Sequence, residues 1–296
     1  MPSRALYLCA GTQSSGSTLI SWCFLQRPDT DGILDARFDK LPQMPPLISA
    51  PLAWCKFTIA CFRMSEVMDY FTDEGWDVKP MLVVRDARSV FNSLITKTYG
   101  RNGTTADDPP LRLRLSRFLE DWELFTERGW PILRYEDLAD DPLGTIRKSC
   151  QRLGIAYDDA MNTWPKPREQ IADATFGNET FIQTRGGTFE KTVDPSLFKI
   201  KTGNIPPDDL QWLETRFAAM NRAMNYPEHV PPQAPATPSR AIPTFENTRR
   251  HDRYRRKRRL SNSIRKITDA VRGMLPTRDK PAATFSPETK GGEGRR

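Results

Sequence analysis

The sequence predicts an α/β fold of the three-layer type, in which a central, mostly parallel sheet carries helices on both faces. Strand-length apolar runs alternate with helix-length segments from the N-terminus to residue 226, and this alternation is typical of parallel sheets whose crossovers are helices. The run at 81–84 is apolar at every position, as expected of a strand buried on both faces. We therefore expect residues 1–226 to form one domain.

The individual elements are predicted from apolar runs and from the residues that bound them. Short apolar runs predict strands at 6–10, 33–34, 54–60, 81–84 and 131–135. Longer apolar or periodic segments predict helices at 19–24, 65–75, 87–98, 111–128, 142–153 and 207–224. Ser65 is a predicted N-cap, and Gly75, Gly129 and Gly154 are predicted helix ends. Residues 160–205 are polar and are expected to be irregular.

Composition limits the class of protein. Hydrophobic residues make up 38% of the 296 residues, a low share that indicates a disordered part. The five cysteines include no C-x-x-C pair and lie mostly in apolar runs, so we expect buried, reduced thiols. No apolar run approaches the ~20 residues of a membrane span. A strand begins almost at the N-terminus, which leaves no room for a signal peptide, and we therefore expect a cytoplasmic protein.

Positive charge is concentrated near the C-terminus. Residues 249–296 hold 16 Lys and Arg against 5 Asp and Glu, whereas the preceding 248 residues hold 28 against 32. Six prolines in 227–243 predict an extended linker over 227–248. The basic segment 249–296 is expected to be largely disordered, with a short amphipathic helix at 260–275.

The basic segment permits three interpretations: a solvated tail, weak association with an anionic membrane surface, and neutralisation of nucleic-acid phosphates. A polybasic run followed by an amphipathic helix favours the membrane over nucleic acid. We therefore expect no nucleic-acid partner. Binding of the tail to an anionic membrane surface would make the protein peripheral to that membrane.

The most informative stretch is the loop of small residues at 11–18. Gly11 and Gly16 have the G-x-x-x-x-G spacing of a phosphate-binding loop, and Thr18 stands where such loops keep a hydroxyl. Ser17 replaces the lysine of a nucleotide-triphosphate loop, so the charge that reaches β- and γ-phosphates is missing. Backbone N–H groups and the dipole of the next helix still favour a phosphate or sulfate group. The alternative is a turn that binds no ligand.

A second polar motif directly follows the buried strand at 81–84. Arg85 stands at the end of that strand, and Ser93 lies eight residues further on, two turns into the next helix. Ligands of open α/β sheets bind at the carboxyl ends of the strands, where an arginine fork and a hydroxyl can hold one phosphate. In the alternative interpretation, Arg85 pairs with Asp86 or Glu136 and has a structural role.

Three segments together resemble the sulfotransferases that use 3′-phosphoadenosine-5′-phosphosulfate (PAPS), over residues 5–226. The segments are G-x-x-S-S-G-S-T at 11–18, R-D-A-R-S-V-F-N-S at 85–93 and L-R-Y-E-D-L-A-D-D-P at 133–142. The resemblance implies that the 5′-phosphosulfate is lined by Ser14, Ser15, Gly16, Ser17 and Thr18. It implies that the 3′-phosphate is bound by Arg85 and Ser93, with Arg185 on a late loop that closes on it. The Y-E-D-L segment is a structural landmark of the family.

Two departures from the family pattern concern catalysis. The family usually has Lys or Arg two residues before the loop glycine, against the transferring sulfuryl group, and this chain has Ser14 there. Many relatives use a histidine as base, but His229 and His251 lie at or beyond the Pro-rich linker. Lys56 is the predicted catalytic cation, because relatives carry an active-site lysine on the corresponding strand. A lysine that extends from a strand end to solvent is the alternative.

The proton acceptor is predicted from the same resemblance. Asp35 follows a short apolar run in a region where some relatives place a catalytic carboxylate, and burial would raise its pKa into the range of a general base. Asp39 and Glu66 are rival candidates, and a solvated loop aspartate is the alternative interpretation of Asp35.

The predicted function is transfer of a sulfuryl group from PAPS to a hydroxyl or amine acceptor, without a metal. The acceptor is expected to be a glycan, a glycolipid or a small molecule, in a pocket built from the loops at 28–52 and 99–110. Two alternatives remain: a P-loop kinase, against which the missing loop lysine counts, and a catalytically inactive nucleotide-binding or scaffold protein, which Ser14 and the lack of a histidine within the domain favour.

Overall fold

A five-stranded parallel sheet forms the centre of the domain in a computed structural model that describes residues 4–36, 38, 41, 51–98, 110–164, 187–188, 200–231 and 249–274. The strands lie in the order β2 (Thr30–Ala36), β3 (Leu52–Thr58), β1 (Ala5–Gly11), β4 (Asp77–Val84) and β5 (Ile132–Arg134). All neighbouring strands pair in parallel. Their carboxyl ends therefore lie along one edge of the sheet, where ligands bind in open α/β folds.

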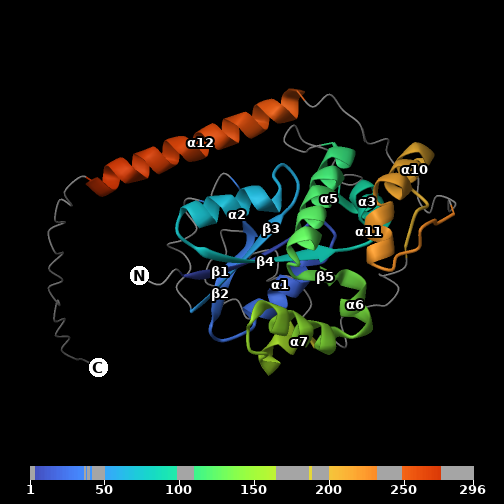
Figure 1. Ribbon diagram of the computed structural model, residues 1–296, viewed down its shortest axis with the longest axis horizontal. Helices are drawn as coiled ribbons and strands as arrows, with labels where there is room; N and C mark the ends of the chain where they lie inside the picture. The colour runs from blue at the N-terminus through green and yellow to red at the C-terminus, as the bar shows by residue number, and fades with distance from the viewer. Residues whose placement is uncertain are drawn as a thin grey trace, which may run out of the picture.

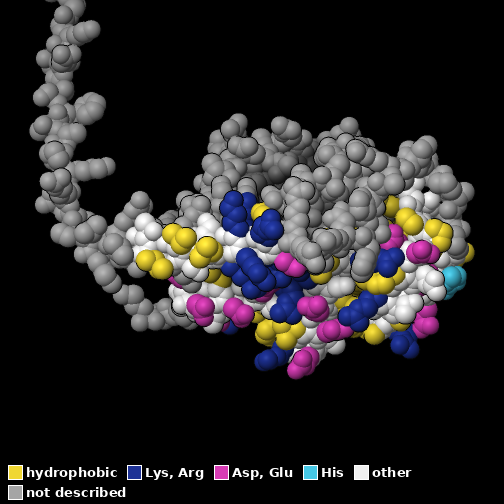
Figure 2. Space-filling model, turned by 90° about the horizontal axis from the view of Figure 1, so that it is seen from above, with side chains coloured by type: hydrophobic (Ala, Val, Ile, Leu, Met, Phe, Trp, Pro, Cys, Tyr) yellow, Lys and Arg dark blue, Asp and Glu magenta, His cyan; other side chains and the backbone are white. Residues whose placement is uncertain are grey.

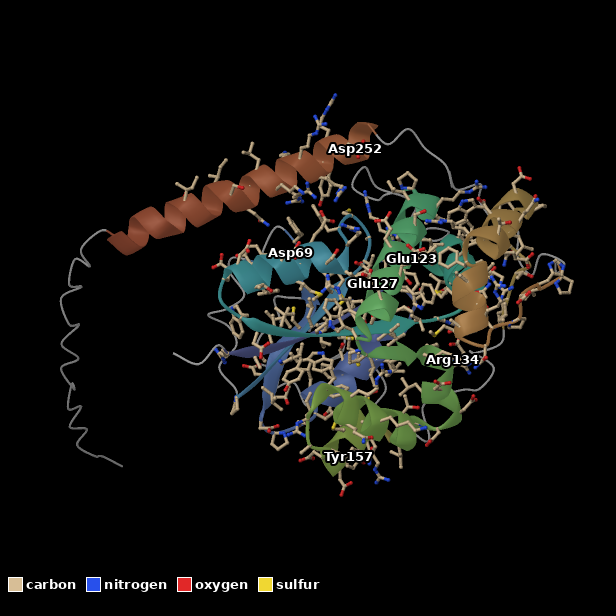
Figure 3. The ribbon with its side chains drawn as sticks, in the orientation of Figure 1. Asp69, Glu123, Glu127, Arg134, Tyr157 and Asp252 are labelled. Carbon is tan, nitrogen blue, oxygen red and sulfur yellow. The ribbon has the colours of Figure 1, made fainter. Side chains whose placement is uncertain are left out.

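Helices cover both faces of this sheet, which confirms the predicted three layers (Figure 1). One face is covered by α1 (Ser17–Leu25), α6 (Tyr135–Asp140) and α7 (Pro142–Leu153). The other is covered by α2 (Met64–Asp73), α3 (Ala87–Ser93), α5 (Leu111–Arg128), α10 (Pro207–Arg216) and α11 (Ala218–Ala223). Figure 3 shows Asp69 of α2 on one side of the sheet and Tyr157, beyond α7, on the opposite side.

Strand β1 shows how one continuous apolar run supplies two cores. Leu6, Leu8 and Ala10 pack into the core on the α2 face, and Tyr7 and Cys9 pack into the core on the α1 face. Successive side chains of a strand point to opposite faces, and all five residues are buried. Because β1 is the central strand and both faces are covered, neither set of side chains needs to be polar.

Helices α5 and α7 end at the predicted residues, and three other segments differ from the prediction. The helix predicted at 207–224 is divided into α10 and α11 at Phe217. The side chain of Phe217 is fully buried and packs in the core on this face of the sheet. The helix predicted at 87–98 consists of α3 and a π-helical turn at Leu94–Thr98. Tyr135, predicted as the last residue of the strand at 131–135, instead begins α6, which contains all four Y-E-D-L residues.

The predicted N-cap of α2, Ser65, is wrong, because the residue before the helix is Arg63. The first-turn N–H groups of Met64 and Ser65 donate to the carboxylate of Asp121 on α5, at 2.6 and 3.3 Å. A carboxylate from another helix thus accepts the first-turn N–H groups that a hydroxyl at the N-cap was expected to accept. Burial raises the pKa of Asp121 to about 6 despite these two hydrogen bonds.

The polybasic residues near the C-terminus are helical. Helix α12 spans Arg249–Met274, so it begins at Arg249 rather than at the predicted Leu260. Lys and Arg are good helix formers, and no Pro or Gly interrupts residues 249–272. Helix α12 lies across the outer side of α2 (Figure 1). Most of the predicted linker, residues 232–248, and the end of the tail, residues 275–296, lie outside the described residues.

The remaining features are short. The predicted irregular region contains a 3₁₀ turn at Asp159–Asn162 and an antiparallel pair of β6 (Thr163–Trp164) and β7 (Gly187–Thr188), and its other residues from 165 to 199 lie outside the described part. The five cysteines are free thiols, four of them buried as predicted. Within the described ranges, no helix is both long enough and apolar enough to span a membrane.

Candidate anion-binding site

The loop between β1 and α1 is a tight turn of small residues. The N–H of Ser15 donates to the carbonyl of Thr12 at 3.2 Å, and the N–H of Ser17 donates to Oγ of Ser15 at 3.4 Å. Gly16 has a φ of 88° and directly precedes Ser17, the first residue of α1. The first-turn N–H groups and the positive end of the α1 dipole therefore border this loop, an arrangement that favours an anion.

Position 16 requires a glycine because of the neighbouring side chains as well as because of its positive φ. A Cβ atom at this position would lie 2.1 Å from Cδ2 of Tyr135, the buried residue that follows β5. The same ring lies against Arg85, whose guanidinium carbon is 4.7 Å from the ring centroid. Tyr135 therefore packs on the loop and on the tip of β4 together.

Arg85 and Ser93, the residues of the second motif, both contact Ser14 in the loop. Arg85 Nη1 donates to the Ser14 carbonyl at 2.8 Å, and the Ser93 and Ser14 hydroxyls are hydrogen bonded at 3.1 Å. Strands β1 and β4 are neighbours, which brings their carboxyl-terminal loops together. Ser14 has a φ of 66°, a conformation that costs a non-glycine residue ~1–2 kcal/mol and that concentrates at functional sites.

Lys56 lies on β3, opposite Cys9 of β1, and only 5% of its surface is exposed. Its Nζ donates to Oγ1 of Thr58 at 2.7 Å, and Thr58 is paired with Gly11, the first glycine of the loop. This burial argues against a lysine that extends to solvent. Burial raises the pKa of the Cys9 thiol to about 12, against the opposing effects of Ser21 and Lys56, so the thiol next to Lys56 is neutral.

The structure adds a cation that sequence reasoning did not identify. Arg114 of α5 is 1% exposed, and its Nη1 donates to Oε1 of Gln13 in the loop. Arg114 lies on the buried side of α5, next to Leu115. A charged residue on the apolar stripe of an amphipathic helix is the signal that identifies such a position.

Three carboxylates were predicted as proton acceptors: Asp35, Asp39 and Glu66. Asp35 is the penultimate residue of β2, but its side chain lies outside the described residues, as does the whole of Asp39. Arg185, the predicted ligand of the 3′-phosphate, also lies outside them. Glu66 accepts the N–H of Arg63 at 2.9 Å and pairs with Arg255 of α12 at 2.8 Å. Burial alone would raise the pKa of Glu66, but these partners lower it below its usual value, which does not suit a general base.

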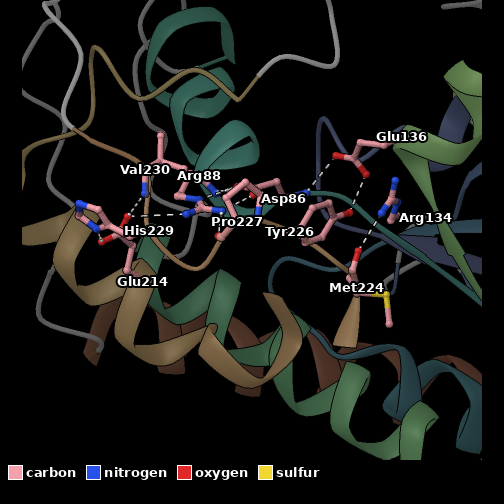
Figure 4. A network of polar contacts seen from close by, with 10 residues as sticks. All are labelled: Asp86, Arg88, Arg134, Glu136, Glu214, Met224, Tyr226, Pro227, His229 and Val230. Atoms are coloured by element: carbon pink, nitrogen blue, oxygen red, sulfur yellow. Dashed lines mark hydrogen bonds and ion pairs between the residues drawn. The ribbon is translucent and has the colours of Figure 1, made fainter. Parts of the chain in front are cut away.

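The Y-E-D-L segment supports the tip of β4 (Figure 4). Oε1 of Glu136 accepts the N–H of Asp86 at 3.3 Å, and Oε2 accepts the hydroxyl of Tyr226 at 2.6 Å. Burial raises the pKa of Glu136, while Tyr226, the Asp86 N–H and the nearby Arg85 act against that rise. The segment predicted as a landmark therefore joins the residue after Arg85 to the residues that follow α11.

A second set of contacts fixes the same region, centred on Arg88 (Figure 4). The buried guanidinium of Arg88 holds both carboxylate oxygens of Asp86, at 3.0 and 2.5 Å, so Asp86 pairs with Arg88. Arg88 also donates to the carbonyl of Pro227 at 2.8 Å, and Glu214 accepts the N–H of Val230 at 2.8 Å. The start of the predicted linker is thus packed on the domain.

The likeness to known proteins is visible in three-dimensional structure. No protein-family model and no curated protein matches the sequence. The sulfotransferase domain from the curacin biosynthetic pathway matches with a TM-score of 0.52 and 11% identity, over 76% of this chain and 98% of that domain. The sulfotransferase domain of the Synechococcus PCC 7002 olefin synthase gives 0.48 and 16%, over 73% and 94%. Mouse sulfotransferase SULT7A1, complexed with PAP, gives 0.44 and 14%, over 75% and 88%.

The chain therefore has a sulfotransferase-like fold, as the three sequence segments indicated. Its central parallel sheet brings the small-residue loop after β1 and the arginine after β4 to one edge, because β1 and β4 are neighbouring parallel strands. Among the described residues, no three His, Cys, Asp or Glu side chains are grouped so as to hold a metal ion.

Proposed function

We propose that this protein is a sulfotransferase that moves a sulfuryl group from PAPS to a hydroxyl or amine group of an acceptor. The observation that carries the proposal is the contact of Arg85 and Ser93 with Ser14, which makes the loop after β1 and the tip of β4 one continuous site. A nucleotide with anionic groups at both its 5′ and 3′ positions is the ligand that suits a site of two such halves.

The residues of the site fit the two ends of this nucleotide. The N–H groups at the start of α1 and the hydroxyl of Thr18 are proposed to bind the 5′ end. Arg85 offers a planar fork, supported by the ring of Tyr135, and with Ser93 it is proposed to bind the 3′-phosphate. Arg185 remains a proposed further ligand of that phosphate.

Lys56 and Arg114 are proposed to supply the charge that Ser14 lacks. They approach the loop from different elements, β3 and α5, and both are buried. PAPS supplies a sulfuryl group whose sulfur bonds to the acceptor atom as its bond to the 5′-phosphate oxygen breaks. Buried cations next to the loop stabilise the negative charge that develops on that oxygen.

Asp35 is proposed to take the proton of the acceptor hydroxyl. It is the penultimate residue of β2, so its backbone lies at the carboxyl edge of the sheet, the same edge as the loop. Glu66 is not proposed, because its carboxylate is engaged by the start of α2 and by α12.

The proposal is tested by transfer of radiolabelled sulfate from PAPS to a panel of alcohols, amines, oligosaccharides and glycolipids. We expect Lys56→Met and Arg114→Met to lower kcat by about 10²–10³, as does loss of one donor from a site that stabilises a developing oxyanion, and to change the Kd of adenosine 3′,5′-bisphosphate less than tenfold. Methionine keeps most of the side-chain volume. Arg128→Met is the matched control, because Arg128 is exposed at the other end of α5.

Two outcomes would contradict this account. Equal losses in kcat and in bisphosphate affinity would assign Lys56 and Arg114 to binding and not to catalysis. Tight binding of the bisphosphate by the wild-type protein, with no transfer to any acceptor, would support the inactive nucleotide-binding alternative.

A further inference from the structure

Helix α12 is attached to the domain by polar and charged contacts. Arg255 Nη2 holds both oxygens of Glu66 at 2.8 and 2.9 Å, and Arg259 contacts the same carboxylate. The buried Asn262 donates to the carbonyl of Phe38 at 2.6 Å. At 100° per residue, these three residues of α12 lie within about 60° of one another on the helical wheel. We call this side of α12 its inner face.

The opposite side of α12, its outer face, is apolar in its C-terminal half. Leu260, Ile264 and Ile267 are 61%, 54% and 65% exposed and are the large hydrophobic residues exposed in the described part of the chain. Their spacing places them on one stripe, turned away from the inner face. An amphipathic helix normally packs its apolar stripe on the domain and its polar side in water, whereas α12 does the reverse.

The same outer face is basic in its N-terminal half. Arg253, Arg256 and Lys257 are exposed and fall within the same arc of about 100° on the helical wheel as the apolar stripe. Figure 2, which views the molecule from the α12 side, shows dark-blue Lys and Arg side chains next to yellow apolar ones along this helix. The whole of α12 holds eleven Lys and Arg against two Asp.

We propose that the outer face of α12 binds an anionic lipid membrane surface. A bilayer interface accepts both halves of this face, because acyl chains take up Leu260, Ile264 and Ile267 while anionic headgroups attract Arg253, Arg256 and Lys257. The inner face keeps its contacts with Glu66 and Phe38, so the domain remains attached to the bound helix. This proposal does not depend on the reaction that the domain catalyses.

Other partners fit the outer face less well. Nucleic acid would neutralise the cations through its phosphates, but it would leave the three apolar side chains in water. A second copy of the chain would cover those side chains, but it would bring two strongly basic helices together. A lipid surface is the partner that suits both the charge and the apolar stripe.

Co-sedimentation of the full-length protein with vesicles tests this proposal. The vesicles are pure phosphatidylcholine, or phosphatidylcholine with phosphatidylserine at a third of the lipid. The apolar variant carries Ile264→Ser and Ile267→Ser, and the basic variant carries Arg253→Ser and Arg256→Ser. The control matched to the basic variant carries Arg128→Ser and Arg216→Ser. These substitutions change the net charge by the same amount as the basic variant does, at exposed positions outside α12. Circular dichroism checks that all variants remain folded.

We expect binding to the anionic vesicles and much weaker binding to the neutral ones. The apolar and the basic variant should each bind the anionic vesicles about tenfold less, and the control variant should bind as the wild type does. Absence of binding to anionic vesicles would overturn the proposal. So would an apolar variant that binds like the wild type while the basic variant binds less, since that pattern describes a general polyanion site, which titration with a single-stranded RNA would then identify.

Discussion

Replacement of Gly16 by alanine perturbs the loop at its tightest point. The new Cβ would lie 2.1 Å from Cδ2 and 2.3 Å from Cε2 of Tyr135, far inside van der Waals contact. The ring is buried and also faces the guanidinium of Arg85. The substitution therefore has to move the ring, and with it the proposed ligand of the 3′-phosphate.

The expected loss of stability has two parts. A left-handed φ costs an alanine ~1–2 kcal/mol, partly offset by the ~0.4–1 kcal/mol gained from a less flexible unfolded chain. Overpacking against Tyr135 adds ~1–3 kcal/mol. We therefore expect Gly16→Ala to lower the free energy of unfolding by about 2–4 kcal/mol.

Gly75→Ala is the matched control. Gly75 has a φ of 85°, close to the 88° of Gly16, but a Cβ there would have no atom within 4 Å. Its loss should be about 1 kcal/mol, the conformational part alone. Urea unfolding measures both variants, and calorimetric titration with adenosine 3′,5′-bisphosphate should show at least tenfold weaker binding only for Gly16→Ala.

A third variant isolates the role of the ring. The loss of stability in the double variant Gly16→Ala with Tyr135→Leu should be smaller than the sum of the two single losses, because the leucine side chain leaves more room for the new methyl group. Equal losses of stability in Gly16→Ala and Gly75→Ala, with unchanged bisphosphate binding in both, would refute the view that packing against Tyr135 shapes the site.

Two further predictions concern stability. Tyr226→Phe removes the 2.6 Å hydrogen bond to Glu136 and should lower the free energy of unfolding by ~1–3 kcal/mol; a loss below ~0.5 kcal/mol in urea unfolding would contradict the role given to this contact. Burial raises the pKa of Asp121 to about 6, so the folded state binds this proton more tightly than the unfolded state does, and the stability associated with Asp121 falls as pH rises from about 4 to about 6. Asp121→Asn should therefore gain ~1–3 kcal/mol relative to the wild type between pH 4 and pH 7, and parallel stability curves for the two proteins would count against this assignment.

Elements determined by their own residues were predictable from the sequence. Helix α5 carries its apolar stripe and its terminal glycine in one continuous segment, and both of its ends were predicted. The start of α2 and the break at Phe217 were not predictable in this way. The first depends on Asp121, a residue of another helix, and the second depends on the core into which Phe217 packs.

The site also contains features that local residues determine and features that depend on residues distant in the sequence. The loop at 11–18 and the residues Arg85 and Ser93 belong to short motifs that each follow one strand, so their proximity followed from the predicted parallel sheet. Arg114 was missed because its contact with Gln13 joins residues 101 positions apart. The role of Glu136 also required a distant partner, Tyr226, which no local pattern indicated.

The helical structure and amphipathic character of α12 were predictable from its own residues, but its orientation on the domain was not. The spacing of its apolar residues predicted an amphipathic helix, and its composition predicted a basic one. Which side would pack on the domain depended on Glu66 and on the carbonyl of Phe38. These groups hold the polar side and leave the apolar side exposed, an arrangement that could not be predicted from the helix alone.

The central claim, that one nucleotide is held at its two ends by the loop after β1 and by the tip of β4, is tested most directly by comparing two ligands. Calorimetric titration measures the affinities of adenosine 3′,5′-bisphosphate and adenosine 5′-monophosphate for the wild type, Arg85→Ala and Ser93→Ala. We predict that the wild type binds the bisphosphate about 10–100-fold more tightly, since hydrogen bonds to charged groups contribute ~1.5–3 kcal/mol. Both variants should lose most of this preference and retain their affinity for the monophosphate. Equal affinity of the wild type for the two ligands, or an equal loss of both affinities in the variants, would contradict the claim.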